Sequence, residues 1–168
     1  MDFSKMKDFL SFLTDWRIPG NSIAVYHKNE KVFEWQTGYE DPEKGTPMTK
    51  DYLFDIYSCS KVATVTSALQ LYERGLFLLD DPLYAFLPEY RTMSVRNPDG
   101  SIREAKNPIT LRHLFTMTAG FNYNTYSPSL LKVRKETENR APTLLAIKAL
   151  ANEPLEYEPG EGWMYSLC

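Results

Sequence analysis

Hydrophobic positions near the start of the chain change from a helical to an alternating pattern. Apolar residues at helical spacing predict an amphipathic helix over residues 3–15. The residues at this spacing are Phe3, Met6, Phe9, Leu10, Leu13 and Trp16. Residues 22–27 and 32–35 then alternate as strands do, and the short polar stretch 28–31 lies between them. This spacing predicts a β-hairpin.

A second periodic stretch covers residues 59–74 and predicts the longest helix of the chain. Its apolar stripe consists of Val62, Val65, Leu69 and Tyr72, widened by Ala68 and Leu71. Gly75 follows at the place of a C-terminal cap. Because the helix is apolar on nearly every side at its start, we expect it to be buried.

The rest of the chain is predicted to consist of short elements and loops. Expected helices are 111–117, with Thr110 as N-cap, and 143–151. Residues 80–88 are expected to form a short turn or helix. Expected loops, turns or small hairpins are 38–50, 91–108, 121–140 and the tight turn 159–162. No repeat or linker divides the chain, so one domain is expected.

Composition narrows the possible classes of protein. The 168 residues are 43% hydrophobic, which excludes intrinsic disorder, and the net charge of −3 without runs of one sign argues against a nucleic-acid partner. No apolar stretch reaches the roughly 18 residues of a transmembrane helix. Since residues 1–5 do not resemble a signal peptide and two cysteines form no disulfide framework, a cytoplasmic location is expected.

The motif Ser-x-x-Lys carries the candidate chemistry and occurs three times. The three pairs are Ser4 with Lys7, Ser58 with Lys61, and Ser129 with Lys132. Ser4 lies near a chain end and Ser129 in an expected loop, whereas Ser58 stands where an apolar segment turns into the long helix. This context selects Ser58 and Lys61 as the candidate pair.

The spacing of Ser58 and Lys61 suggests a mechanism. Residues three apart at a helix start share one face, so the amine and hydroxyl can meet. Burial and the positive end of the helix dipole both disfavour an ammonium, so we expect the pKa of Lys61 to fall toward neutrality. A neutral lysine can accept the serine proton and activate a nucleophile. The structural alternative is an N-capping serine beside a surface lysine.

Residues 54–61 (FDIYSCSK) resemble the nucleophile segment of the penicillin-recognising serine hydrolases. This family includes class C β-lactamases, D-Ala-D-Ala carboxypeptidases (penicillin-binding proteins) and esterases with the β-lactamase fold. Further similar segments follow in the family's order: 75–90, 109–120 (ITLRHLFTMTAG) and 159–166 (PGEGWMYS). The resemblance thus covers nearly the whole chain.

The resemblance implies an α+β fold of the β-lactamase/DD-peptidase type, with an antiparallel sheet flanked by helices and a mainly helical region. Residues 1–168 would form the N-terminal portion of one catalytic domain: 1–57 a helix and the first two sheet strands, 58–168 the helical region. It also implies Ser58 as acylated nucleophile, Lys61 as proton acceptor and Tyr165 as proton shuttle. The substrate would be a small acyl compound, and no cofactor or metal would be needed.

Three departures from the family pattern shape the expectation. Leu167 stands where the common Tyr-x-Asn motif has asparagine, which favours an ester over a β-lactam. Met117 replaces a family histidine and is interpreted as structural drift. The third motif, Lys-Thr-Gly or His-Thr-Gly on a later strand, does not occur, so we expect the C-terminal strands and one oxyanion-hole donor to lie on a missing or separate segment.

Several alternatives stay open at this point. The protein could be a non-catalytic member that binds acyl ligands, or an inactive fragment that requires the missing half. Within the hydrolases, the substrate could be an ester, a D-amino-acid peptide or a β-lactam. His27 and His113 are interpreted as structural, Cys59 as a buried thiol, and Asp80 with Asp81 as a cap and turn instead of a metal site.

Overall fold

A computed structural model describes all residues, 1–168, in two compact units. The first unit is Met1–Ser58 and the second is Cys59–Cys168. Each unit is described by itself. None of the helices combines the length and apolar character needed to cross a lipid bilayer. That residues 1–168 belong to one catalytic domain stays a prediction.

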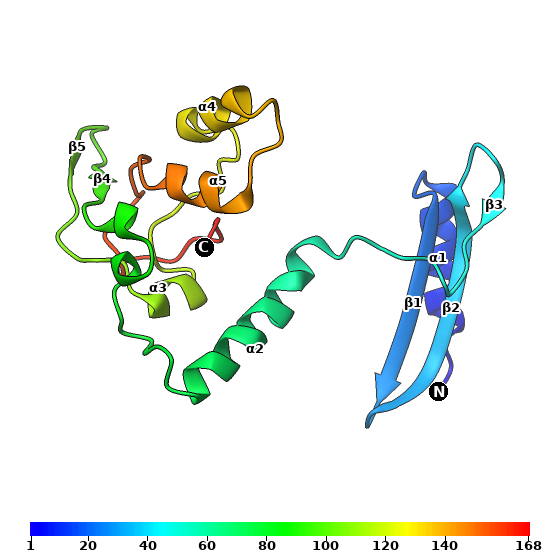
Figure 1. Ribbon diagram of the computed structural model, residues 1–168. Coiled ribbons are helices and arrows are strands. Elements are labelled where there is room, and N and C mark those ends of the chain that lie inside the picture. The colour runs from blue at the N-terminus through cyan, green and yellow to red at the C-terminus, as the bar shows by residue number, and fades with distance from the viewer. The chain divides into compact units, whose positions relative to one another are not determined.

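The first unit is a helix beside an antiparallel sheet of order β1-β2-β3 (Figure 1). Its elements are α1 (Ser4–Asp15), β1 (Gly20–His27), β2 (Glu30–Asp41) and β3 (Thr46–Pro47). Helix α1 packs along β1 and β2, and the Phe3 ring stacks on the Phe33 ring with centroids 4.4 Å apart. The predicted N-terminal helix and hairpin are therefore present.

The hairpin turns at Lys28 and Asn29, whose φ angles of 49° and 66° both lie in the left-handed region. Two consecutive left-handed residues are typical of the type I′ turn, whose twist matches that of the strands it joins. The register pairs Ile23 with Trp35 and Val25 with Phe33. Apolar side chains thus stand opposite each other on one face of the sheet.

The predicted loop 38–50 is wrong in part, because β2 continues to Asp41 and β3 pairs with it. The sheet therefore has three strands here, not two. The prediction ended the strand before Gly38, because glycine is usually read as a loop residue. The φ of Gly38 is +81°, and a Cβ there would lie 2.3 Å from the Pro19 carbonyl oxygen, so only glycine fits this bend in the strand.

The second unit consists of helices and a small hairpin at its edge (Figure 1). After the 3₁₀ turn η1 (Tyr57–Cys59), its elements are α2 (Ser60–Glu73), η2 (Leu83–Ala85), η3 (Pro88–Tyr90), β4 (Ser94–Arg96), β5 (Ile102–Glu104), α3 (Leu111–Phe115), α4 (Pro128–Glu136) and α5 (Thr143–Leu150). Strands β4 and β5 form the small hairpin expected within residues 91–108. With the sheet of the first unit, these elements make the chain α+β as predicted.

The core of the second unit does not include α2. It is formed by Leu83, Tyr90, Met93, Val95, Ile109, Ala119, Phe121 and Leu155. No residue of α2 is buried, and Val62 is 73% exposed. The prediction that this helix is buried is therefore wrong for these residues, because its apolar side chains lie on all sides while only part of its surface is covered.

Helix α4 lies within residues 121–140, where a loop was predicted. Only two of its residues, Leu130 and Val133, are buried, and this single i, i+3 pair is too short to be read as a period. The helix starts where Ser127 and Pro128 stand at the N-cap and first helical positions. These are the residue types typical of a helix start, and the prediction overlooked them.

His113 caps the start of α3. Thr110 is the N-cap as predicted, and its backbone N–H donates to His113 Nδ1 at 3.1 Å in a capping box. Partial burial lowers the pKa of His113, the Arg112 cation lowers it further, and Asp80 opposes both. His113 is therefore neutral in the folded protein at neutral pH, and only the neutral ring can accept this bond through Nδ1.

Folding stability is expected to fall in mild acid because of His113. Its pKa is lower in the folded than in the unfolded chain, so its contribution is complete above the unfolded value, about 6.5. The contribution is lost as pH falls through the lower, folded value. Melting temperatures between pH 8 and pH 5 would show the effect. His113→Gln should remove this part of the pH dependence, because glutamine caps without titrating. An unchanged slope would contradict the assignment, and the exposed His27 (His27→Gln) is the control.

Candidate active site

Ser58 lies in η1, immediately before α2. Its side chain is exposed, and the preceding Tyr57 has a φ of 43°. A bulky residue in the left-handed region is uncommon and costs conformational energy, so it marks a sharp change of chain direction just ahead of the serine. Cys59 is exposed, so its prediction as a buried thiol is wrong. The residue stands at the N-cap, where no other element covers it.

Lys61 occupies the first turn of α2, three residues after Ser58, as the motif requires. Its side chain is partly buried, less than predicted, because α2 itself is not a core helix. The Nζ atom lies 5.1 Å from the centroid of the Tyr165 ring. Two predicted site residues that are distant in sequence are thus brought together.

Tyr165 also contacts Tyr123, which was not predicted as a site residue. The two rings have centroids 5.5 Å apart and planes inclined by 41°. Tyr123 lies in a stretch with neither a period nor a motif, so no sequence signal identified it. The proximity of Lys61, Tyr123 and Tyr165 creates a site with one amine and two phenols, groups that can accept or donate protons.

The Tyr165 segment, defined here as residues 156–168, is held by backbone hydrogen bonds to residues 117–122. The bonds are Glu156 N to Gly120 O (2.8 Å), Gly160 N to Thr118 O (2.9 Å), Met164 N to Met117 O (3.1 Å) and Leu167 N to Asn122 O (3.3 Å). The Met117 carbonyl accepts a hydrogen bond from the backbone N–H of Met164, which directly precedes Tyr165. Met117, which replaces a family histidine, therefore keeps a structural role through its backbone.

Gly160 forms the bend of the predicted turn 159–162. Its φ is +90°, and a Cβ there would lie 3.2 Å from His113 Nε2. The turn therefore needs a residue without a side chain, both for its conformation and for its packing against the His113 ring. Since His113 belongs to α3, this contact also fixes the Tyr165 segment against that helix.

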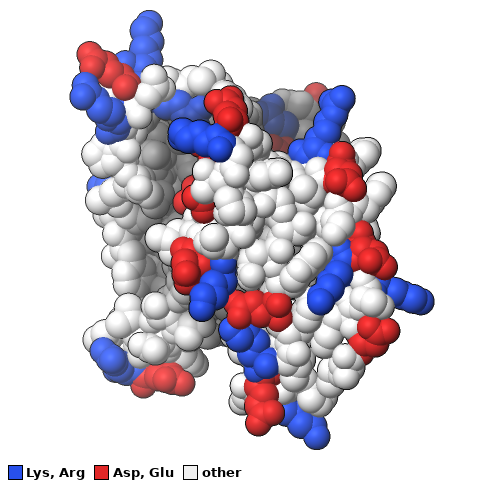
Figure 2. All heavy atoms as spheres, turned by 90° about the vertical axis from the view of Figure 1, so that its right-hand side faces the viewer, with Lys and Arg blue, Asp and Glu red and all other residues white.

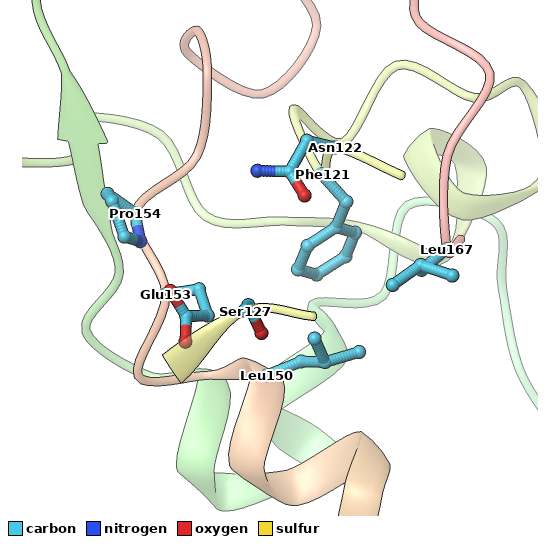
Figure 3. Close-up of a pocket in the computed structure, with 7 residues that line it drawn as sticks. All are labelled: Phe121, Asn122, Ser127, Leu150, Glu153, Pro154 and Leu167. Carbon is cyan, nitrogen blue, oxygen red and sulfur yellow. The ribbon is translucent and has the colours of Figure 1, made fainter. Parts of the chain in front are cut away.

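Leu167 faces a small pocket (Figure 3). Phe121, Asn122, Ser127, Leu150, Glu153 and Pro154 line the rest of it. Leu167 thus shares this pocket with apolar Phe121 and Leu150 as well as with polar side chains. An asparagine at this position would have placed an amide there instead. The leucine therefore changes the local polarity two residues after Tyr165.

Charged groups of both signs occur together on the face shown in Figure 2. On the face drawn in Figure 2, Lys and Arg side chains are interspersed with Asp and Glu side chains, and no area carries a single sign. No group of three or more His, Cys, Asp or Glu side chains is placed to hold a metal ion. Asp80, considered as half of a metal site, forms an ion pair with Arg112 at 2.8 Å.

Comparison with protein families gives a match along almost the entire chain. A family model described as Beta-lactamase matches residues 7–168. Esterase EstB of Burkholderia gladioli is 32% identical over 164 residues, covering 93% of this chain and 40% of the relative. The acyltransferase calJ of Penicillium decumbens is 32% identical over 142 residues, covering 80% of this chain and 34% of the relative.

Solved structures show the same architecture. EstCE1, described as a hydrolase with promiscuous acyltransferase activity, superposes with a TM-score of 0.77 at 25% identity and covers 98% of this chain and 44% of its own. A penicillin-binding protein homologue from Pyrococcus abyssi superposes with a TM-score of 0.74 at 23% identity, covering 99% of this chain and 36% of its own. The chain thus spans less than half the length of these relatives.

Proposed function

The chain belongs to the beta-lactamase family, and from that premise we propose that the full protein is a serine hydrolase acting through an acyl-enzyme on Ser58. The observation that carries the proposal is the position of Lys61. It stands one helical turn after Ser58, and its Nζ lies 5.1 Å from the Tyr165 ring centroid. This proximity of the amine to the phenol ring supports the proposal that Lys61 accepts the Ser58 proton and Tyr165 shuttles it.

The proposed reaction starts with proton transfer from the Ser58 hydroxyl to the Lys61 amine. Ser58 Oγ attacks the substrate carbonyl carbon, whose oxygen becomes an oxyanion near the Ser58 backbone N–H. As the tetrahedral intermediate collapses, the bond to the leaving alkoxide breaks. Lys61 and Tyr165 return the proton to that alkoxide, which departs as an alcohol.

The acyl group is then carried on Ser58 as an ester. A water molecule gives a proton to the same amine–phenol pair and attacks the acyl carbon. The Ser58–acyl bond breaks, Ser58 Oγ regains its proton, and the carboxylic acid leaves. No redox partner is required, because all electrons stay paired in the bonds exchanged.

An ester is the proposed substrate class. The relatives include a named esterase and a named acyltransferase, both of which handle acyl groups. Leu167 supports the same choice, because its apolar side chain offers no amide to hold a β-lactam or peptide substrate. The alternative is a member of the family that binds acyl ligands without turnover.

Covalent labelling of the full protein tests this proposal. Incubation with a fluorophosphonate should add one adduct mass, and peptide mapping should place it on Ser58. A p-nitrophenyl butyrate assay should show turnover that exceeds the turnover of nitrocefin. Cys59→Ser is the matched control, because the adjacent exposed thiol is the competing nucleophile and its loss should leave the adduct intact. An adduct absent from Ser58, together with no ester hydrolysis, would favour the binding protein.

A further inference from the structure

Glu158 is a buried carboxylate near the start of the Tyr165 segment. Its side chain is 2% exposed, although acidic side chains are rarely buried unless they are paired. It lies two residues before Gly160 and seven before Tyr165, and it is not part of the proposed proton transfers. The contacts of the Glu158 carboxylate therefore indicate its role.

Four polar contacts surround the Glu158 carboxylate. Arg103 Nη1 donates to Oε1 as an ion pair. The backbone N–H of Lys106 donates to Oε1 at 3.1 Å and to Oε2 at 3.0 Å, and that of Asn107 donates to Oε2 at 3.4 Å. Arg103 is itself oriented, since its Nε donates to Asn97 Oδ1 at 3.0 Å. The carboxylate thus joins the start of the Tyr165 segment to the β4–β5 hairpin and the loop after it.

These contacts determine the charge state of Glu158. Burial raises the pKa of the carboxyl, but hydrogen bonds from Arg103 and from the amides of Lys106 and Asn107 outweigh burial and lower the pKa below its ordinary value. The group is therefore ionised at neutral pH. A buried ion pair contributes little net stability because of its desolvation cost, but it penalises any arrangement that leaves the charge unpaired.

Backbone hydrogen bonds of the Tyr165 segment connect Glu158 to the position of Tyr165. After Glu158, the chain is held at Gly160 by Thr118 and at Met164 by Met117, and Tyr165 follows directly. If the Glu158 end of the segment shifts, the turn at Gly160 and the bond at Met164 shift with it. The Tyr165 ring would then lose its place beside Lys61.

We propose that Glu158 is a positioning residue for Tyr165: its contacts with Arg103, Lys106 and Asn107 hold the Tyr165 segment where the phenol lies beside Lys61. The inference rests on the proposed function for its catalytic consequence. Its structural part, the restraint of residues 156–168, does not depend on that function and is testable without turnover.

Glu158→Gln keeps the shape of the side chain and removes its charge. In the full protein it is expected to lower kcat for p-nitrophenyl butyrate by about 10- to 100-fold with KM within about twofold, because small misplacements of a catalytic group carry costs of this order. In a Tyr165→Phe background the same substitution should cost less than about twofold, since the phenol it positions is gone. A purely structural role would give the same loss in both backgrounds and would overturn the inference.

Hydrogen exchange gives the readout that is independent of activity. Glu158→Gln should speed exchange of the amides of Gly160, Met164 and Leu167 by at least about tenfold, because the bonds that protect them open locally. If the wild-type protein forms no Ser58 adduct yet the exchange changes as expected, the proposed function fails and the restraint stands. If the adduct forms and the exchange does not change, the restraint fails.

Two further variants sharpen the test. Glu89→Gln is the matched control, because Glu89 on η3 forms a 2.6 Å ion pair with Lys148 on α5, and neither residue belongs to the Tyr165 segment. It should leave exchange and kcat unchanged, and an equal effect would overturn the inference. Should Glu158→Gln fail to fold, Arg103→Lys keeps the charge but loses the contact with Asn97, and a smaller change in the same amides is expected.

Discussion

Ser58→Ala is expected to lower kcat/KM for p-nitrophenyl butyrate by about 10⁴- to 10⁶-fold, the range seen when a serine hydrolase loses its nucleophile. Alanine has no oxygen to form the acyl-enzyme, so neither the lysine nor the tyrosine can compensate. Stopped-flow and steady-state ester hydrolysis measure the loss. Intact mass after fluorophosphonate treatment should show no adduct at this position.

The chain contains its own control for this prediction. Ser129 forms a second Ser-x-x-Lys motif with Lys132, at the start of α4. Ser129→Ala should keep kcat/KM within about twofold, because the Ser129 hydroxyl takes no part in the proposed reaction and the backbone N–H that donates to Glu153 is kept. Activity of Ser58→Ala above a tenth of the wild-type value would contradict the assignment of the nucleophile.

Lys61→Met is expected to lower kcat by about 10²- to 10⁴-fold, the usual contribution of a positioned general base. Methionine preserves most of the length and apolar stem of the lysine but cannot accept the Ser58 proton. Both acylation and deacylation should slow, because the same amine serves each step. Single-turnover kinetics with a p-nitrophenyl ester would separate the two steps.

Lys132→Met is the matched control for this second prediction. The Lys132 side chain is 75% exposed and makes a 4.0 Å helical ion pair with Glu136. Removing it should leave kcat unchanged, because a surface pair of this kind contributes little. If Lys61→Met acylates as fast as the wild type, the proton acceptor is another group, and the proposed role of Lys61 is wrong.

Local patterns predicted the elements that depend on local physics. The helix over residues 3–15, the hairpin after it and the helix ending at Gly75 follow from periodicity and capping, and the structure has all three. The α4 helix was missed because only Leu130 and Val133 mark its buried side. Strand β3 was missed because two residues, Thr46 and Pro47, gain strand character only by pairing with β2.

Burial was predicted less well than secondary structure. The apolar sequence of α2 predicts a core helix, yet none of its residues is buried. Its Lys61 side chain is partly exposed. An apolar composition states what a helix can bury but not which element covers it. Glu158 is the converse case: its side chain is only 2% exposed although it is charged, and no sequence pattern indicates this burial.

The candidate site also contains some residues that the sequence predicts and others that only the tertiary structure brings in. The pairing of Ser58 with Lys61 needs only one helical turn, so residue spacing predicts it, and motif resemblance adds Tyr165. The approach of Tyr165 to Lys61, the neighbouring Tyr123 and the restraint by Glu158 arise only in the tertiary structure. They depend on backbone hydrogen bonds between residues 117–122 and 156–168, and such long-range pairing leaves no periodic trace in either segment.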